Sequence, residues 1–143
     1  MNTQTLKQKE VFETSAKNLF DLLMNESKVV SYYGPGQIGR ETGDSFALGG
    51  MIFGKNEKIV PNKLIQQAWR IVIPGVWPED HFSNLTIELT EQDDKTILHL
   101  EQEGVPELCY TDLNLGWKTY YWDRIRKVLK GEKIPTEELI NNV

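Results

Sequence analysis

The sequence predicts one α+β domain, in which a curved antiparallel sheet of six to seven strands wraps around a long C-terminal helix, with two short helices after the first strand. Three observations predict this fold class. Apolar and polar residues alternate along the middle of the chain, as in half-buried strands. The last third has apolar residues every three to four positions, as in an amphipathic helix. A chain of 143 residues also has the length of a single domain with one core.

The first third of the chain predicts a strand followed by two helices. Residues 6–12 have the spacing of a strand. Thr14 and Ser15 then offer side-chain oxygens that can cap a first helix. A second, short helix over 26–33 must end at the glycine–proline–glycine sequence of residues 34–36, because proline removes a donor and glycine permits left-handed dihedrals. We therefore expect a turn there.

The middle of the chain predicts a meander of antiparallel strands. The glycine pair at 49–50 indicates a hairpin or a bulge, and polar residues at 92–95 indicate a second turn. Alternation is cleanest after residue 82, where Leu85, Ile87 and Leu89 share one face. The predicted strands cover residues 46–48, 51–59, 64–73 and 82–90, and a last strand follows the turn at 92–95.

Residues 107–130 predict one helix of roughly 36 Å, at about 1.5 Å per residue. Gly131 is the expected C-cap. We take residues 1–131 as the domain and residues 132–143 as a tail, with one helical turn possible at 135–138. The expected apolar stripe of the helix comprises Leu113, Trp117, Tyr120, Tyr121, Ile125 and Val128.

The order of these elements is typical of the START-like, or helix-grip, fold. More specific are four linked segments, at residues 46–54, 59–70, 77–86 and 116–121. Their sequences are Phe-x-Leu-Gly-Gly-x-Ile-x-Gly, Ile-Val-Pro-x-Lys-x-Ile-x-x-x-Trp-Arg, Trp-Pro-Glu-x-His-Phe-Ser-x-Leu-Thr and Gly-Trp-x-x-Tyr-Tyr. They resemble the heat-shock protein 90 ATPase activator homologues, and the resemblance covers nearly the whole chain.

The resemblance implies a cytosolic, co-chaperone-like domain that binds heat-shock protein 90. Two-domain members of the family carry a separate N-terminal domain that makes a large part of the chaperone contact. This chain starts at the first strand of the equivalent of their second domain, so ATPase stimulation stays an open question. A second hypothesis, of another class, is a carrier that holds a small hydrophobic ligand between sheet and helix.

Charge is unevenly distributed along the chain. The net charge of -5 argues against a general affinity for nucleic acid. Residues 117–133 nevertheless carry six basic and two acidic residues, a local charge of 6 - 2 = +4. This basic face can steer an acidic partner, although cations near a helix C-terminus also favour the helix dipole. The candidate partner-binding residues are Lys118, Arg124, Arg126 and Lys127.

Aromatic residues are the candidates for a ligand cavity between sheet and helix, because ligand pockets favour aromatic walls. Plain core packing is the alternative, since aromatic side chains dominate small cores without any ligand. Trp77 differs because it falls in a predicted loop, where it can contribute to partner binding. The candidate cavity residues are Trp69, Trp77, Phe82, Trp117, Tyr120 and Tyr121.

Several classes of function have no support in the sequence. Glu79 and His81 share a loop, but no nucleophile or metal set accompanies them, so we predict no enzymatic activity. The spacing of His81, His99 and Cys109 matches no zinc pattern, and no phosphate-binding loop or nucleophile elbow occurs, so we expect no cofactor. No apolar run is long enough to span a membrane. The polar residues 1–10 and the single cysteine favour a cytoplasmic setting.

Overall fold

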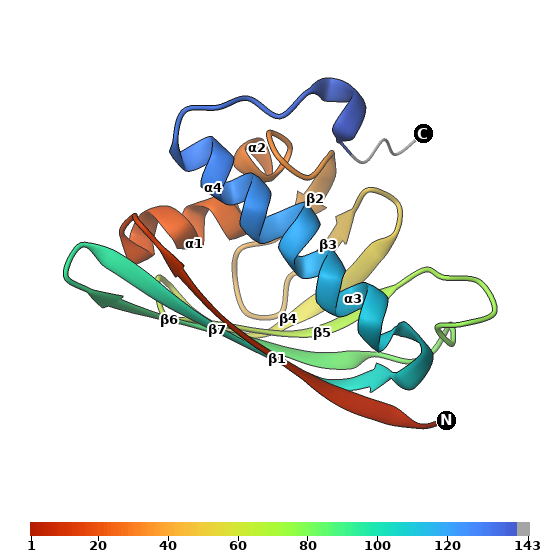
Figure 1. Cartoon of the computed structure of the whole chain (residues 1–143). Helices are drawn as coiled ribbons and strands as arrows, with labels where there is room; N and C mark the ends of the chain where they lie inside the picture. Colours follow the sequence, from red (N-terminus) through yellow and green to blue (C-terminus); the bar gives the residue numbers. More distant parts are fainter. Residues whose placement is uncertain (140–143) are drawn as a thin grey trace.

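The computed structural model describes residues 1–139, which form one curved seven-stranded antiparallel sheet with helices against its concave face (Figure 1). The predicted fold class is confirmed. The strands are β1 (Thr3–Phe12), β2 (Gly36–Ile38), β3 (Ser45–Leu48), β4 (Ile52–Val60), β5 (Leu64–Ile71), β6 (Ser83–Gln92) and β7 (Lys95–Pro106). The helical elements are α1 (Ala16–Met24), α2 (Glu26–Val29), η1 (Glu107–Cys109), α3 (Tyr110–Gly116), η2 (Trp117–Trp122), α4 (Asp123–Leu129) and η3 (Thr136–Glu138).

The sheet is a meander from β2 to β7, closed on one side by β1. Its strand order is β1-β7-β6-β5-β4-β3-β2. Gly49 and Gly50, with φ of 58° and 66°, make the tight turn between β3 and β4, as expected for a hairpin whose two central residues both need positive φ. Asp93 and Asp94 do the same between β6 and β7, with φ of 52° and 66°. Both predicted turns are confirmed, and the glycine pair forms a hairpin turn.

The edge strand β2 was not predicted from the sequence. It has only three residues, too few for a visible alternation. Gly36 belongs to this strand and pairs with Leu48 of β3. A Cβ atom at Gly36 would lie 2.5 Å from the carbonyl oxygen of Ala47, so the close approach of the two strands requires glycine there. The predicted turn at 34–36 therefore extends one residue too far, because the sheet begins at Gly36.

The C-terminal helix runs without a break from Glu107 to Leu129, which confirms the predicted helix at 107–130. Its middle segment, η2, is a π-helix. In a π turn each N–H bonds five residues back, so a residue and the one five positions on lie on the same side of the helix. Trp117 and Trp122 consequently stack, with ring centroids 5.6 Å apart. The predicted apolar stripe was wrong in one place, because Trp122 is buried and Tyr120 is exposed.

The end of this helix has the predicted glycine cap. Gly131 has a φ of 80°, and its N–H donates to the carbonyl of Val128. The N–H of Glu132 donates to the carbonyl of Lys127, which completes a Schellman motif. In the segment that we treat as a tail, Ile134 is buried in the core, so part of it packs on the domain. Residues 140–143 of that tail lie outside the described residues, and the boundary at 131 stays a prediction.

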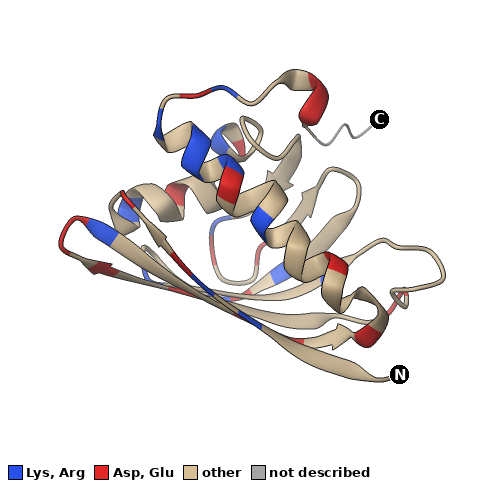
Figure 2. Cartoon of the chain, viewed as in Figure 1, with Lys and Arg blue, Asp and Glu red and all other residues tan. Residues whose placement is uncertain are grey.

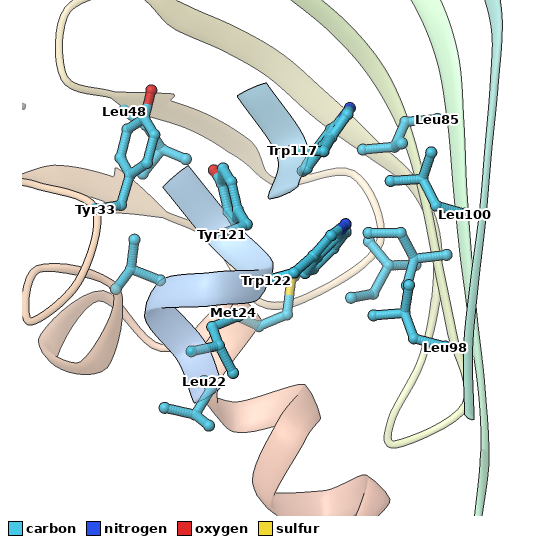
Figure 3. Packing of buried hydrophobic residues seen from close by; sticks show 14 of the residues in the cluster. Leu22, Met24, Tyr33, Leu48, Leu85, Leu98, Leu100, Trp117, Tyr121 and Trp122 are labelled. Atoms are coloured by element: carbon cyan, nitrogen blue, oxygen red, sulfur yellow. The ribbon is translucent and has the colours of Figure 1, made fainter. Parts of the chain in front are cut away.

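The core lies between the concave face of the sheet and the C-terminal helix, with α1 and α2 covering the rest of that face (Figure 1). Figure 3 shows Trp117 and Trp122 of the helix against Leu85, Leu98 and Leu100 of the sheet. Among residues 1–139, no helix combines the length and the apolar character needed to cross a bilayer.

Candidate functional site

An apolar pocket of about 180 Å³ lies between the C-terminal helix and the sheet. The helix, the strands β4 and β5 with the residues next to them, and Tyr33 after α2 form its walls. Its wall holds one acidic residue, Asp112, and is otherwise aliphatic or aromatic apart from a thiol and a glycine. The lining residues are Tyr33, Met51, Ile52, Trp69, Ile71, Ile73, Cys109, Asp112, Leu113, Gly116, Trp117, Tyr120 and Tyr121.

A buried chain of hydrogen bonds fixes one wall of this pocket. The indole N–H of Trp117 donates to Oε1 of Gln102 at 2.9 Å, and Nε2 of Gln102 donates to Oγ of Ser83 at 2.9 Å. The Ser83 hydroxyl in turn donates to the carbonyl of Trp69, also at 2.9 Å. Gln102 and Ser83 have no exposed surface, so these bonds lie in a low-dielectric interior where they hold side chains in one orientation. The pocket is therefore preformed on its Trp69 and Trp117 side.

A second, much smaller cavity of about 40 Å³ lies deeper between the helix and the sheet. It shares Trp69, Trp117 and Tyr121 with the first pocket and is otherwise lined mainly by aliphatic side chains of the sheet. The larger pocket is itself smaller than the roughly 300–1,000 Å³ typical of sites for drug-sized ligands.

Tyr33, Tyr121 and Cys109 in the pocket wall are neutral at physiological pH. Burial raises the pKa of Tyr33 to about 12, with a further contribution from Tyr120, and burial raises the pKa of Tyr121 well above its ordinary value. Burial and the nearby carboxylate of Asp112 raise the pKa of the Cys109 thiol. A thiol that is less ionised is a weaker nucleophile. The pocket wall is thus suited to contact and hydrogen bonding.

Four of the six predicted cavity residues line this pocket, namely Trp69, Trp117, Tyr120 and Tyr121. Phe82 does not, because Ser83 takes the inward position opposite Trp69 and the alternation of the strand turns Phe82 to the other face, where it is 47% exposed. It lies in a shallow hollow on the outer face of the sheet instead.

Trp77 is also outside the pocket; it lies in the predicted loop, between β5 and β6, but it is buried. Its side chain is only 2% exposed and packs edge-on against Trp69, with ring centroids 5.8 Å apart. Its indole N–H donates to the carbonyl of His81 at 2.8 Å, and Nε2 of His81 lies 2.6 Å from the carbonyl of Gly104 in β7. These contacts attach the loop to the sheet, so Trp77 is unavailable as a partner contact.

The four predicted partner-binding residues divide into two pairs. Arg124 is only 8% exposed, and its Nη1 donates to the carbonyl of Tyr32 at 2.8 Å. Arg126 pairs with Glu10 at 2.7 Å and lies 4.5 Å from the ring centre of Phe12. Both arginines therefore hold the helix to the rest of the domain. Lys118 and Lys127 are exposed and form no salt bridge with any residue in 1–139.

The exposed lysines belong to one row along the helix. The N–H of Asp123 bonds to the carbonyl of Lys118 across the π turn, and Lys127 and Lys130 follow at helical spacing. Figure 2 shows that the basic residues gather in α4, whereas acidic residues occupy the start of the helix. This is the polarity that the helix dipole favours. The row carries three cations and one carboxylate, so it keeps a positive charge.

The residues that sequence reasoning missed are those that only the fold brings together. Tyr33 precedes the turn at 34–36, and Cys109 and Gly116 belong to the start of the C-terminal helix. For Cys109 and Gly116 the sequence offers one signal, their spacing. Together with Leu113 and Tyr120 they recur every three or four residues along one side of the helix. Within the part of the chain that the structure describes, no three His, Cys, Asp or Glu side chains are grouped as metal ligands.

The fold and the pocket together define a helix-grip domain with an apolar pocket beside its C-terminal helix. Comparison with known proteins gives the same assignment in narrower terms. The model of the family described as "Activator of Hsp90 ATPase homolog 1-like protein" matches residues 13–130. The chain belongs to this family.

Individual relatives support the family assignment. The chain is 28% identical over 121 residues to the mouse (Mus musculus) activator of 90 kDa heat shock protein ATPase homolog 1, covering 83% of this chain and 35% of the relative. It is 32% identical over 128 residues to the Dictyostelium discoideum homolog, covering 87% and 32%. The chain thus spans about a third of the length of these curated relatives.

A solved structure shares the fold at lower sequence identity. The crystal structure of an HSP90 activator from Plasmodium falciparum superimposes with a TM-score of 0.77 at 20% identity, covering 91% of this chain and 99% of that one. At this identity the likeness concerns the fold alone.

Proposed function

We propose that this chain is a co-chaperone-like domain that binds Hsp90 and modulates its ATPase. The observation that carries the proposal is the family match over residues 13–130, together with relatives whose names describe them as activators of this ATPase. The fold supports it, because the polar atoms and aromatic rings of the core form a rigid scaffold and leave the outer face of the helix free for contact.

The lysine row on the C-terminal helix is the surface that we assign to the encounter with Hsp90. It comprises Lys118, Lys127 and Lys130. Exposed charges at the rim of an interface act mainly on the association rate and on its salt dependence. The row therefore predicts a complex that forms more slowly as salt rises.

Charge reversal tests this surface directly. We expect Lys118→Glu combined with Lys127→Glu to lower the association rate with purified Hsp90 about 3- to 10-fold at low salt and to flatten its salt dependence. The matched control reverses Lys7 and Lys9, two exposed lysines of β1 on the outer face of the sheet. Equal losses in both double variants would rule out the lysine row, and absence of any complex with the unaltered chain would refute the proposed function.

A second candidate function is the binding of a small apolar molecule, which the pocket beside the helix specifically favours. Its volume of about 180 Å³ and its mostly apolar wall suit a compact ligand. The two functions are separable, because the lysine row and the pocket lie on different sides of the same helix, and the two can be altered independently.

A further inference from the structure

We propose that the pocket binds a neutral single-ring molecule that carries a hydrogen-bond acceptor, such as a ketone, and that the hydroxyls of Tyr33 and Tyr121 donate to that acceptor. This inference rests on the second proposed function and adds the chemical class of the ligand.

Tyr33 and Tyr121 are almost completely buried, at 4% and 8% exposure, yet neither hydroxyl bonds to any residue in 1–139. Their rings lie side by side in the pocket wall, with centroids 5.1 Å apart. The neighbouring Tyr32 behaves differently, because its hydroxyl donates to the carbonyl of Leu22 at 2.8 Å. The missing partners are therefore a property of the pocket, and not of tyrosines in this core generally.

Both hydroxyls are accessible from the pocket. In the described part of the chain, the one sealed side-chain nitrogen or oxygen without a partner is Nε of Arg70, so the two tyrosine oxygens are not sealed. Figure 3 shows them pointing away from Leu22 and Met24, which fill the opposite part of the core.

Buried polar groups in proteins are almost always hydrogen-bonded. Two donors that find no partner among residues 1–139 therefore bond to an oxygen inside the pocket, either that of water or that of a ligand. A hydrocarbon would leave both hydroxyls unpaired, whereas a carbonyl oxygen has two lone pairs and can accept from both. A polar ligand atom at this point is favoured over a purely apolar ligand.

The ligand must be uncharged. Burial keeps both tyrosines protonated at neutral pH, so they are donors without a positive charge. A carboxylate placed there would lose its hydration, and Asp112 in the same wall would repel it. The cation nearby, Arg124, lies behind the ring of Tyr120, outside the pocket lining, and already donates to the carbonyl of Tyr32. The size of the pocket, about 180 Å³, is close to that of an engineered cavity of roughly 150 Å³ that binds benzene. One ring and a short substituent fill it.

The experiment compares two probes of nearly equal shape, acetophenone and cumene, which differ by a carbonyl oxygen in place of a methyl group. Binding to the full chain is followed by tryptophan fluorescence, to which Trp69 and Trp117 of the pocket wall contribute together with Trp77 and Trp122. Protection of Cys109, the one cysteine of the chain, from methyl methanethiosulfonate gives a second readout at the same site. We expect acetophenone to bind about 3- to 10-fold more tightly than cumene, the gain of roughly one hydrogen bond.

Variants assign that gain to the hydroxyls. Tyr33→Phe and Tyr121→Phe should each reduce the preference for acetophenone and leave cumene binding unchanged, whereas Tyr110→Phe, outside the pocket, should change neither. Gly116→Leu should abolish both, because Gly116 has ordinary helical dihedrals and a Cβ there meets nothing closer than 3.9 Å, so the added side chain has room to occupy the pocket. Gly116→Ala is its matched control.

The outcomes separate the two ideas. Equal affinity for both probes in the unaltered chain would overturn the ligand class and leave a purely apolar site. Failure of both probes to bind a chain with native circular dichroism would overturn the site itself, and with it the second proposed function. A preference for acetophenone that survives in both tyrosine variants would overturn the assignment to these hydroxyls.

Discussion

The interface between the C-terminal helix and the sheet differs between its two ends. At the packed end, around Trp122, Ile125 and Phe12, side chains are almost completely buried, and the ring of Phe12 meets that of Trp122 edge-on. At the open end, around Tyr33, Cys109 and Tyr121, the same helix leaves the pocket of about 180 Å³. One helix thus holds the fold together at one end and keeps a space at the other.

The two ends also differ in how their polar atoms are satisfied. At the packed end the indole N–H of Trp122 donates to Oε1 of Gln8 at 2.6 Å, and the chain itself supplies the partner. At the open end the hydroxyls of Tyr33 and Tyr121 have none among residues 1–139. One continuous core therefore has a closely packed part that stabilises the fold and a separate part that is open to a ligand.

The largest expected effect is a matched pair of isoleucine truncations. Ile125→Ala at the packed end should lower the free energy of unfolding by about 2–5 kcal/mol, because it leaves a cavity in a fully enclosed site. Ile73→Ala, in the half-buried wall of the pocket, should cost only about 1 kcal/mol, since it enlarges a space that already exists. Urea denaturation of both variants measures the difference, and equal losses would break the comparison.

The second largest expected effect is a difference in stability between substitutions of a buried arginine and of an exposed lysine on the same helix. Arg124→Leu removes the bond to the carbonyl of Tyr32 and should cost about 1.5–3 kcal/mol, the range for a hydrogen bond with a charged donor. Lys127→Leu, on the exposed row, should stay within about 0.5 kcal/mol. Thermal unfolding distinguishes them, and an unchanged melting temperature for Arg124→Leu would show that its burial has no structural role.

High pH should lower the free energy of unfolding, because Tyr33 at the open end ionises. The pKa of Tyr33 is about 12 in the folded chain and near 10 when unfolded, so its contribution is complete below pH 10 and is lost as pH rises toward 12. The loss should be on the order of 2 kcal/mol by pH 12. Denaturation midpoints from pH 8 to 12 measure it. A Tyr33→Phe variant should show a shallower decline, and an identical decline would contradict this assignment.

The smallest expected effect is a gain in stability. Gly116→Ala should stabilise the chain by up to about 1 kcal/mol, because alanine has the higher helix propensity and the added Cβ makes only an ordinary contact with Tyr120 at 3.9 Å. The midpoint of chemical denaturation reports it. A loss instead would mean that the pocket wall at Gly116 is already in tight contact, which would sharpen the limit on ligand size.

Most of the fold was predictable from the sequence because burial imposes a period that is visible in the residues. Strand alternation located β3 to β7, and the glycine pair at 49–50 located a turn, since both positions require positive φ. The strand β2 was not predictable, because three residues show no period. Its place is set by pairing with β3, a contact between segments that sequence spacing does not report.

The site was predictable only in part. Trp69, Trp117 and Tyr121 follow from their inward positions, but Phe82 and Trp77 depend on register and on loop packing. Arg124 has the composition of a surface residue and is buried because its head group reaches a backbone carbonyl. Whether such a side chain is buried depends on which hydrogen-bond or packing partner the fold brings near it, and the local sequence pattern does not contain this information.

The π turn at Trp117–Trp122 places one residue more in this helix than an α-helix needs between the same flanking turns. Deleting one residue inside the turn would restore ordinary helical spacing and leave Ile125 facing the interior. Deleting a residue just after it, such as Asp123, would instead rotate every later side chain by about 100° around the axis, with an axial shift of about 1.5 Å. Ile125 would then leave the interior, and the glycine at the end of the helix would no longer meet its turn. Homologous chains should therefore accept the loss of one residue inside the π turn but not in the α-helical turns after it.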